Sequence, residues 1–494
     1  MTARVPWSAL QINPVLKTLH ALARGRGQRV WLVGGTVRDL LLGLKAPDLD
    51  LAASGDALAL GQALAQEVGA RFVPLKEEMA TCRVVITGEP GGGYLDLVGL
   101  RAPTIEDDLR ARDFTVNALA LELGALLKGR QRTLDPTGGR ADLAARRLRP
   151  AGPGVLEDDP LRVLRAFRFI STHGLVPAPG VLANLAAAAP GLFRVARERI
   201  GQEWRKLMAG PGAARALAAM EQAQTLTRLI PELAGGRGLA QNPFHHLDVL
   251  GHNLACLASL EDIAADLAGQ LGDLAAEAGA YLMEEDWRFV LKTASLFHDL
   301  GKPSTRQDKE PGWSSFHRHD LVGAGLAWQA ARRLGLGKAE SGQVARLVRE
   351  HMRPFHLLGA FNRGGVSRRA ARRLLVAAGP DLAGLFLMGL ADTMAGRGPQ
   401  RPPEAEERLL LLWRLINGMR DSELARALEA PPLVDGHTLM RELGLAPGPE
   451  VGLILGLLRR AQLDGSIVDP PQALDLARRL RARAAAMARA KAAT

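Results

Sequence analysis

The amino-acid sequence predicts an α+β protein in which a mixed N-terminal domain is followed by an all-helical remainder. Up to about residue 150, short apolar runs alternate with turn residues, which is typical of strands in a mixed fold. Beyond about residue 155, long stretches of alanine, leucine and arginine with helical periodicity take over. A chain of 494 residues is long enough for three or four domains of ~100–200 residues each.

The N-terminal domain is expected to contain at least four strands and a helix. The strands are expected over 30–33, 49–52, 83–87 and 94–98, and the helix over 36–42. The segment AGPGVLEDDP reads as a hinge, and the proline-rich GRGPQRPPEAEER reads as a linker before the last helical unit. The expected domains therefore cover residues 1–150, 151–240, 241–395 and 405–494.

The composition favours some function classes over others. A formal charge of +11 and a pI of about 10.2 favour a polyanionic partner such as nucleic acid, although an arginine-rich composition alone would give the same balance. The two cysteines, Cys82 and Cys256, make no disulfide framework, so a reducing cytoplasm is expected. No apolar run reaches the ~18–20 residues of a membrane helix, so no membrane partner is expected.

The stretch LVGGTVRDLLLGLKAPDLDLA, residues 32–52, combines a glycine pair with two alternating aspartates. Residues i and i+2 of a strand share a face, so Asp48 and Asp50 project together. Two neighbouring carboxylates repel each other unless a cation lies between them, and Mg²⁺ prefers such oxygen ligands. The alternative is a half-exposed strand with a solvated polar face.

The residues around the aspartates suit a phosphate-bearing substrate. Gly34 and Gly35 lack a Cβ atom, so their backbone can approach a phosphate at the start of a helix. Arg38, one turn into that helix, can hold a phosphate with several donors. Asp96 lies between apolar neighbours on another expected strand and offers a third carboxylate.

Several motifs follow one another in an order that resembles the tRNA nucleotidyltransferase and bacterial poly(A) polymerase family. They are LVGGTVRDLLLG…PDLDL, RDFTVNALAL (112–121), DPTGGRADLAARRLR (135–149), EDDPLRVLRAFRF (157–169) and RERIGQEWRKLM (197–208). The resemblance implies a polymerase-β-like nucleotidyltransferase head and an all-α neck. It also implies Mg²⁺ on Asp48 and Asp50, with Asp96 as the third catalytic carboxylate.

In that family the second motif binds ribose and triphosphate, and the matching residues here are Arg112, Asp113 and Asn117. The chain departs from the family at Ala111, where an arginine is usual, and at Asp158, where a glutamate is frequent.

The fourth motif resembles the family's nucleotide-selecting motif. Asp159 before Pro160 suits a helix N-cap, and Arg162, Arg165 and Arg168 then recur along one side of the helix. Asp159 as acceptor and Arg162 as donor complement cytosine or adenine, whereas guanine and uracil would leave polar groups unpaired at roughly 1–3 kcal/mol each. The alternative is a capped helix with a solvated basic stripe.

A histidine-rich region resembles the HD phosphohydrolase superfamily. His298 and Asp299 are adjacent, and His245 upstream and Asp392 downstream complete a His…His-Asp…Asp order that suits a divalent metal of unknown identity. His246 competes with His245, while His319 and His351 are further candidate ligands or phosphate contacts. The resemblance implies phosphatase and 2′,3′-cyclic phosphodiesterase activity.

The two resemblances together imply transfer of NMP from CTP or ATP to the 3′-OH of tRNA, with a helical RNA-binding tail. Residues 97–111 are short where relatives that add A carry a longer loop, which predicts CC addition and a separate A-adding enzyme as partner. A harmless loop deletion is the other interpretation, under which the enzyme adds the full CCA end. Two other functions stay open: a poly(A) polymerase, and an HD phosphohydrolase whose head only binds RNA.

Overall fold

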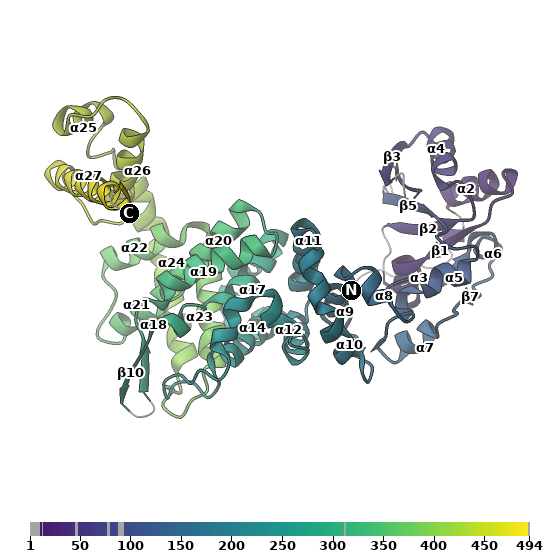
Figure 1. Ribbon diagram of the computed structural model, residues 1–494. Helices are drawn as coiled ribbons and strands as arrows, with labels where there is room; N and C mark the ends of the chain where they lie inside the picture. The colour runs from purple at the N-terminus through teal and green to yellow at the C-terminus, as the bar shows by residue number, and fades with distance from the viewer. Residues whose placement is uncertain are drawn as a thin grey trace. The chain divides into compact units, whose positions relative to one another are not determined.

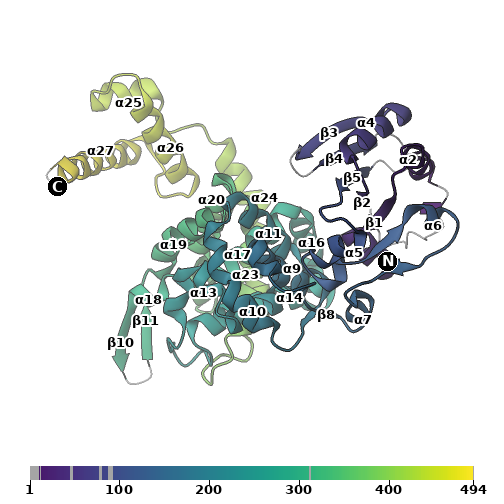
Figure 2. The same cartoon turned by 45° about the vertical axis from the view of Figure 1, so that its right-hand side comes forward.

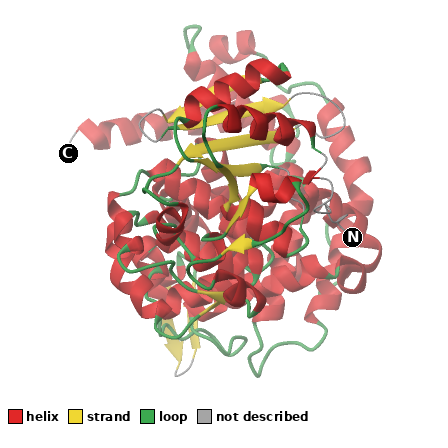
Figure 3. Cartoon of the chain, turned by 90° about the vertical axis from the view of Figure 1, so that its right-hand side faces the viewer, coloured by secondary structure: helices red, strands yellow, loops and turns green. Residues whose placement is uncertain are grey.

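The computed structural model describes residues 10–11, 13–44, 48–76, 80–86, 93–310 and 313–492. The chain divides into two compact units, 1–225 and 226–494. The first unit holds the main sheet, and the second is built from helices and a hairpin (Figures 1 and 3). The predicted α+β class is therefore confirmed. The division falls inside the segment 151–240, and the four predicted domain ranges stay predictions.

The first unit is organised around a seven-stranded sheet. Its strands β2 and β5 run parallel, and the other neighbours pair antiparallel. The order is β3 (Arg71–Lys76), β4 (Thr81–Ile86), β5 (Gly93–Gly99), β2 (Leu49–Ala53), β1 (Val30–Val33), β6 (Ala120–Glu122) and β7 (Thr133–Leu134).

The strand predictions hold, with small differences at the ends. The strand at 30–33 is observed as predicted, β2 ends one residue later than predicted, and β5 is one residue longer at each end. Strand β4 starts two residues before the predicted position, and residue 87 lies outside the described residues. Helix α3 (Gly34–Leu41) starts at the glycine pair, two residues before the predicted start.

The two faces of this sheet differ in what covers them. Helices α2 (Pro14–Gly25) and α4 (Ala57–Val68) pack on one face, where Leu51, Leu95 and Leu97 join their leucines in a buried core. The opposite face is only partly covered, by apolar residues of α5 (Ile105–Arg110). Because side chains alternate along a strand, the residues between these leucines point toward the less covered face.

Helices continue the first unit after the sheet. Three of them, α9 (Leu161–His173), α11 (Arg197–Ala209) and α12 (Ala213–Gln222), pack together around fully buried Phe167 and Trp204. The smaller elements are η2 (Thr115–Asn117), α6 (Leu123–Leu127), α7 (Gly139–Ala144), β8 (Arg147–Leu148), α8 (Val155–Asp158), β9 (Val176–Pro177), α10 (Val181–Ala188) and η3 (Ala189–Arg194).

The second unit is a helical body from which the hairpin β10 (Arg306–Glu310) and β11 (Trp313–Phe316) projects (Figure 2). Sequence periodicity did not predict this hairpin. The helices of the body are α13 (Leu226–Leu229), η4 (Pro231–Gly236), α14 (Val249–Ala265), α15 (Leu267–Leu271), η5 (Gly272–Leu274), α16 (Ala275–Met283), α17 (Glu285–Phe297), α18 (Lys302–Thr305), α19 (His319–Arg333), α20 (Lys338–Glu350), α21 (Arg353–Phe361), α22 (Arg368–Ala378), η6 (Gly379–Asp381), α23 (Leu382–Ala395) and α24 (Ala405–Glu429).

The end of the chain forms α25 (Gly436–Leu443), α26 (Pro449–Leu463) and α27 (Pro470–Ala492). These helices share a small apolar core that includes Leu439, Ile454 and Ala473. By length and composition the stretch Arg368–Ala395 could cross a membrane, but 83% of its most apolar window is buried inside the protein, as in a core helix. Both cysteines are buried free thiols.

Candidate functional sites

The carboxylates of the first unit lie on the less covered face of the sheet. The parallel register of β2 and β5 places Asp50 directly opposite Asp96. Burial and the negative charge of Asp96 raise the pKa of Asp50 above its ordinary value. Burial and the nearby Asp96 therefore disfavour the charged form of Asp50, and a divalent cation between the two carboxylates would relieve their repulsion. These residues therefore fit the predicted cation.

Asp48 stands just before β2 and is exposed. The Thr36 hydroxyl fixes this turn, because it donates to the carbonyl of Asp48 (3.3 Å) and accepts from the backbone N–H of Asp50 (2.7 Å). Helix α3 thereby holds the start of β2, where Asp48 precedes the strand and Asp50 lies on it. Asp96 has a second partner that sequence reasoning missed: Arg83 on β4 contacts both of its carboxylate oxygens at 2.7 Å.

The glycine pair makes room beside these acids. Gly34 has φ +63°, and a Cβ atom there would lie 2.9 Å from Nη1 of Arg112. At Gly35 a Cβ atom would lie 3.3 Å from Oδ2 of Asp50. The Gly34 N–H donates to the carbonyl of Leu119 (3.2 Å), so this glycine supplies space rather than a free donor. Any larger residue would crowd the acid and the arginine.

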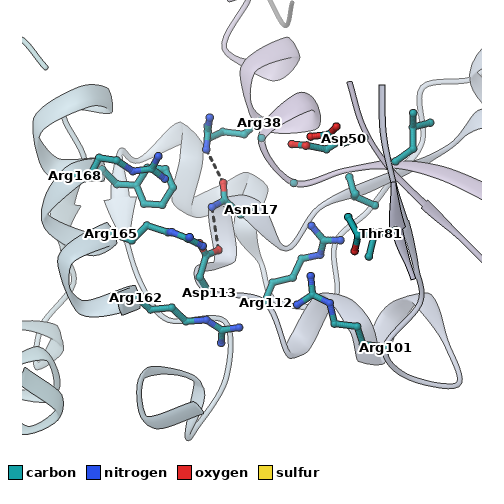
Figure 4. A pocket seen from close by; sticks show the side chains of 17 residues that line it. Arg38, Asp50, Thr81, Arg101, Arg112, Asp113, Asn117, Arg162, Arg165 and Arg168 are labelled. Carbon is teal, nitrogen blue, oxygen red and sulfur yellow. Dashed lines mark hydrogen bonds and ion pairs between the residues drawn. The ribbon is translucent and has the colours of Figure 1, made fainter. Parts of the chain in front are cut away.

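A cavity of about 450 Å³ opens at this face (Figure 4). Most of the predicted nucleotide-binding residues line it, whereas Asp48 and Asp159 are not among its lining residues. Sequence reasoning missed Thr81, Arg101 and Phe169. The predicted residues that line it are Gly34, Gly35, Arg38, Asp50, Asp96, Arg112, Asp113, Asn117, Arg162, Arg165 and Arg168.

A hydrogen-bonded chain crosses this cavity from helix α3 to helix α9. Arg38 donates to the amide oxygen of Asn117 (2.7 Å), and the Asn117 amide donates to Asp113 (3.0 Å). Arg165 donates to the other oxygen of Asp113 at 3.2 Å. Burial alone would raise the pKa of Asp113, but the charge of Arg165 and the hydrogen bond from Asn117 hold it below its ordinary value. Asp113 is therefore a fixed anion that positions Arg165 directly and Arg38 through Asn117.

Two more cations belong to the cavity wall, the exposed Arg101 and the half-buried Arg168. Burial lowers the pKa of Arg101 and of Arg168, so an anionic ligand would stabilise both guanidinium groups. Glu203 of α11 is buried and lies 3.1 Å from Nε of Arg168 and 3.6 Å from Nε of Arg165. Sequence reasoning missed Glu203, because nothing in the motif RERIGQEWRKLM indicated that it contacts the arginines of α9.

The predicted base-reading pair has other partners in this structure. Asp159 accepts from Arg199 at 2.9 Å and from the backbone N–H of Leu161 at 3.3 Å. Arg162 donates to the carbonyl of Val155 at 2.9 Å. Helix α9 begins at Leu161, one residue after the predicted start, although the Asp159 carboxylate still accepts a hydrogen bond from its first turn. The base-reading role of this pair stays a prediction.

A second candidate site is a cluster of buried histidines in the second unit. His298, His319 and His351 each donate Nδ1–H to a backbone carbonyl three residues earlier, at 2.6–2.8 Å. Because a carbonyl only accepts, each neutral ring keeps a bare Nε2. The Nε2 atoms of His319 and His351 lie 3.2 Å apart. Two acceptors at this distance need a cation between them, so the residues fit a metal.

Carboxylates complete the cluster. Asp299 lies 3.2 Å from Nε2 of His298 and 3.4 Å from Nε2 of His319, and Asp392 lies 2.8 Å from Nε2 of His252. Both His298 and Asp299 are almost completely buried. Burial lowers the pKa of His351 to about 3, which keeps this ring neutral and able to bind a metal.

His252 is the ligand candidate that sequence reasoning missed. It is fully buried, whereas the predicted His245 stands with its ring centroid 4.7 Å from that of His252 and groups with His252 and Asp392. Both histidines lie in the motif FHHLDVLGH. His252 differs from His245 in lying on the buried face of helix α14. His246 accepts from the backbone N–H of Arg397 (3.3 Å) instead.

Lys302 is a buried cation at the edge of the cluster. Its Nζ lies 2.5 Å from Asp299 and donates to Gln241 at 2.6 Å. Burial would raise the pKa of Asp299, but the charges of His298 and Lys302 hold it well below its ordinary value. Asp299 therefore stays a carboxylate ligand for a cation.

Family models match the three parts of the chain in sequence order. The "Poly A polymerase head domain" matches residues 30–101 and 96–149, the "Probable RNA and SrmB-binding site of polymerase A" matches 174–235, and the "HD domain" matches 249–388. Together with the paired carboxylates and the histidine cluster, these matches define a nucleotidyltransferase that carries an HD domain.

Comparison with known proteins identifies the family. The chain is 38% identical to the A-adding tRNA nucleotidyltransferase of Deinococcus radiodurans, over 90% of this chain and 93% of that protein. It is 34% identical to the CC-adding tRNA nucleotidyltransferase of Thermus thermophilus, over 88% and 90%. A CCA-adding enzyme in complex with ATP shares its fold, with a TM-score of 0.58 and 20% identity over 95% of this chain and 96% of that one. The chain belongs to the tRNA nucleotidyltransferase family, and it is an enzyme.

The histidine cluster predicts a metal-dependent stability. Adding Mn²⁺, Ni²⁺ or Zn²⁺ to the EDTA-treated chain should raise its melting temperature, since a ligand that binds only the folded state stabilises it. The double variant His298→Ala/Asp299→Ala should lose most of this shift, as should His319→Ala, because each removes a ligand. Thermal unfolding with and without metal measures it.

The control is His437→Ala, which changes an exposed histidine in the C-terminal part. It should keep the full shift. An equal shift in all four proteins would place the metal outside this cluster.

Proposed function

We propose that this chain transfers NMP units from CTP or ATP to the 3′-OH of tRNA that lacks its CCA end, and releases pyrophosphate. The observation that carries the proposal is the register of β2 and β5, which sets Asp50 beside Asp96 at the mouth of an arginine-lined cavity. Family membership supports the same reaction, because the relatives named above are tRNA nucleotidyltransferases.

The residues in and beside the cavity divide the tasks of this reaction. Mg²⁺ bound by Asp48 and Asp50, with Asp96 nearby, would activate the attacking hydroxyl and stabilise the leaving pyrophosphate. Arg38 and Arg112 supply positive charge for the triphosphate. The fixed Asp113–Asn117 pair can orient the ribose.

The length of one connection supports CTP as the main substrate. Strand β5 ends at Gly99 and helix α5 begins at Ile105, so five residues join them. In the family this position carries a longer loop in enzymes that add A. We therefore favour CC addition, with the terminal A added by a separate A-adding enzyme.

A-addition is the second candidate, because the relative with 38% identity is an A-adding enzyme. Poly(A) synthesis uses the same chemistry as CC addition and A-addition. It differs in the RNA that is extended and in the number of nucleotides added before the enzyme stops. A head that merely binds RNA is disfavoured, because such a head has no need for aligned carboxylates.

We further propose that the HD domain is a metal-dependent phosphohydrolase that trims phosphates from RNA 3′ ends. The bare Nε2 atoms and the buried carboxylates support this assignment. We also propose that the C-terminal helices contact tRNA through their arginines, and that the enzyme works in the cytoplasm.

Asp50→Ala should abolish nucleotide addition, with a loss of at least a thousandfold in rate, because it removes the cation site. Binding of tRNA should stay within about threefold, since binding depends on distributed phosphate contacts. Single-turnover incorporation of radiolabelled CTP and a filter-binding assay measure the two effects.

The matched control is Glu67→Ala, an exposed acid of α4 on the opposite face of the sheet. It should retain both activities. Normal incorporation by Asp50→Ala would remove the catalytic assignment.

The choice of nucleotide can be read from a gel. Transcripts of tRNA ending before the CCA sequence, after C and after CC are incubated with CTP or ATP separately. The short β5–α5 connection predicts two additions from CTP on the first transcript and poor addition of A on the third. Efficient addition of a single A to the third transcript, without use of CTP, would establish the A-adding alternative, and long A tails would establish a poly(A) polymerase.

A further inference from the structure

Two side chains beside the carboxylates belong to no part of the nucleotide cavity. Arg83 of β4 and Tyr94 of β5 point to the same face of the sheet as Asp96, because β5 alternates Tyr94 and Asp96 with buried Leu95 and Leu97. Neither residue is among those that line the cavity. Their place next to the reacting acids calls for an explanation.

The geometry of this pair is well defined. Both carboxylate oxygens of Asp96 accept from Arg83 at 2.7 Å, and the guanidinium carbon lies 4.5 Å from the centroid of the Tyr94 ring. Bidentate pairing and ring stacking together hold an arginine in one orientation. Tyr94 is 43% exposed, so part of the residue is accessible to a ligand.

The position of the pair indicates which ligand it meets. Asp96 has Asp50 opposite it on one neighbouring strand and Arg83 opposite it on the other. A transfer reaction brings two substrates to the acids, and the cavity already accounts for the triphosphate. The acceptor strand therefore needs an approach outside that cavity, and β4 and β5 offer a cation and an open ring.

We propose that Arg83 and Tyr94 bind the 3′-terminal nucleotide of the RNA acceptor. The Tyr94 ring stacks on the terminal base, and Arg83, positioned by Asp96, pairs with the adjacent phosphate. Stacking is tolerant of sequence, since every base has a π-face. This tolerance suits an acceptor whose terminal base changes after each addition, so the inference rests on the proposed function and assigns its second substrate site.

A cycle of two changes tests the stacking. The full-length chain is given tRNA ending in C, or the same tRNA with an abasic terminal nucleotide that retains its 3′-OH. With the wild-type chain, the abasic end should raise the KM for RNA about tenfold. Tyr94→Ala should raise the KM for normal RNA by a similar factor and show no further rise with the abasic end, because both changes remove the same contact. The KM for the nucleotide should not change.

Three further variants sharpen the test. Tyr94→Phe keeps the ring and should behave as wild type. Trp328→Ala removes an aromatic side chain of similar exposure (44%) from α19 and should change nothing. Arg83→Gln should reduce the slope of log KM for RNA against log salt by about 0.7, the value for one phosphate contact to a single strand.

Two results would overturn the proposal. If the effects of Tyr94→Ala and of the abasic end multiply, or if Tyr94→Ala leaves the KM for RNA unchanged, the terminal base does not stack on Tyr94. If the wild-type chain extends no RNA, the proposed function is wrong as well. If the chain extends RNA equally well with and without the Tyr94 side chain, only this inference is wrong.

Discussion

The candidate nucleotide site depends on one interaction, the parallel pairing of β2 with β5. The other neighbouring strands of this sheet pair antiparallel. The parallel pair sets Asp50 opposite Asp96 on the less covered face, while leucines of both strands enter the core. A one-residue slip of either strand would turn its acid into that core, so the hydrophobic pattern fixes the register of the acids. Burial of the neighbouring leucines thus forces Asp50 and Asp96 to lie close together, although their charges repel each other.

Two buried acids near this face, Asp113 and Glu203, lie in contact with half-buried arginines. Asp113 holds Arg165, and Glu203 lies within 3.6 Å of Arg165 and 3.1 Å of Arg168. Removing one member of such a group leaves an uncompensated buried charge, which costs about 3–5 kcal/mol. Helix α9 is therefore fixed against both the head and α11, and the arginines that line the cavity are positioned before a ligand arrives. Preorganised cations stabilise developing charge without reorganising during the reaction.

Much of this could be predicted from sequence, where the evidence was local. Short apolar runs between turn residues identified the strands, a period of two predicted that Asp48 and Asp50 share a face, and the order of motifs indicated the cavity residues. Contacts set by tertiary register could not be predicted. Arg83 meets Asp96 only because β4 pairs with β5 in one particular alignment. His252 and His245 look equivalent in the sequence, and only packing of α14 buries the first. The strand β10, RQDKE, escaped prediction because it is polar throughout and shows no alternation.

The central claim is that Asp50 and its neighbours hold the cation at which nucleotides are transferred. Crystals of the full-length chain grown with Mn²⁺ and a non-hydrolysable CTP analogue test it most directly, because anomalous scattering locates the metal. The account predicts Mn²⁺ at ligand distance from carboxylate oxygens of Asp48 and Asp50, with the triphosphate beside Arg38 and Arg112. A bound nucleotide with Mn²⁺ only at the histidine cluster, and none at these aspartates, would contradict it.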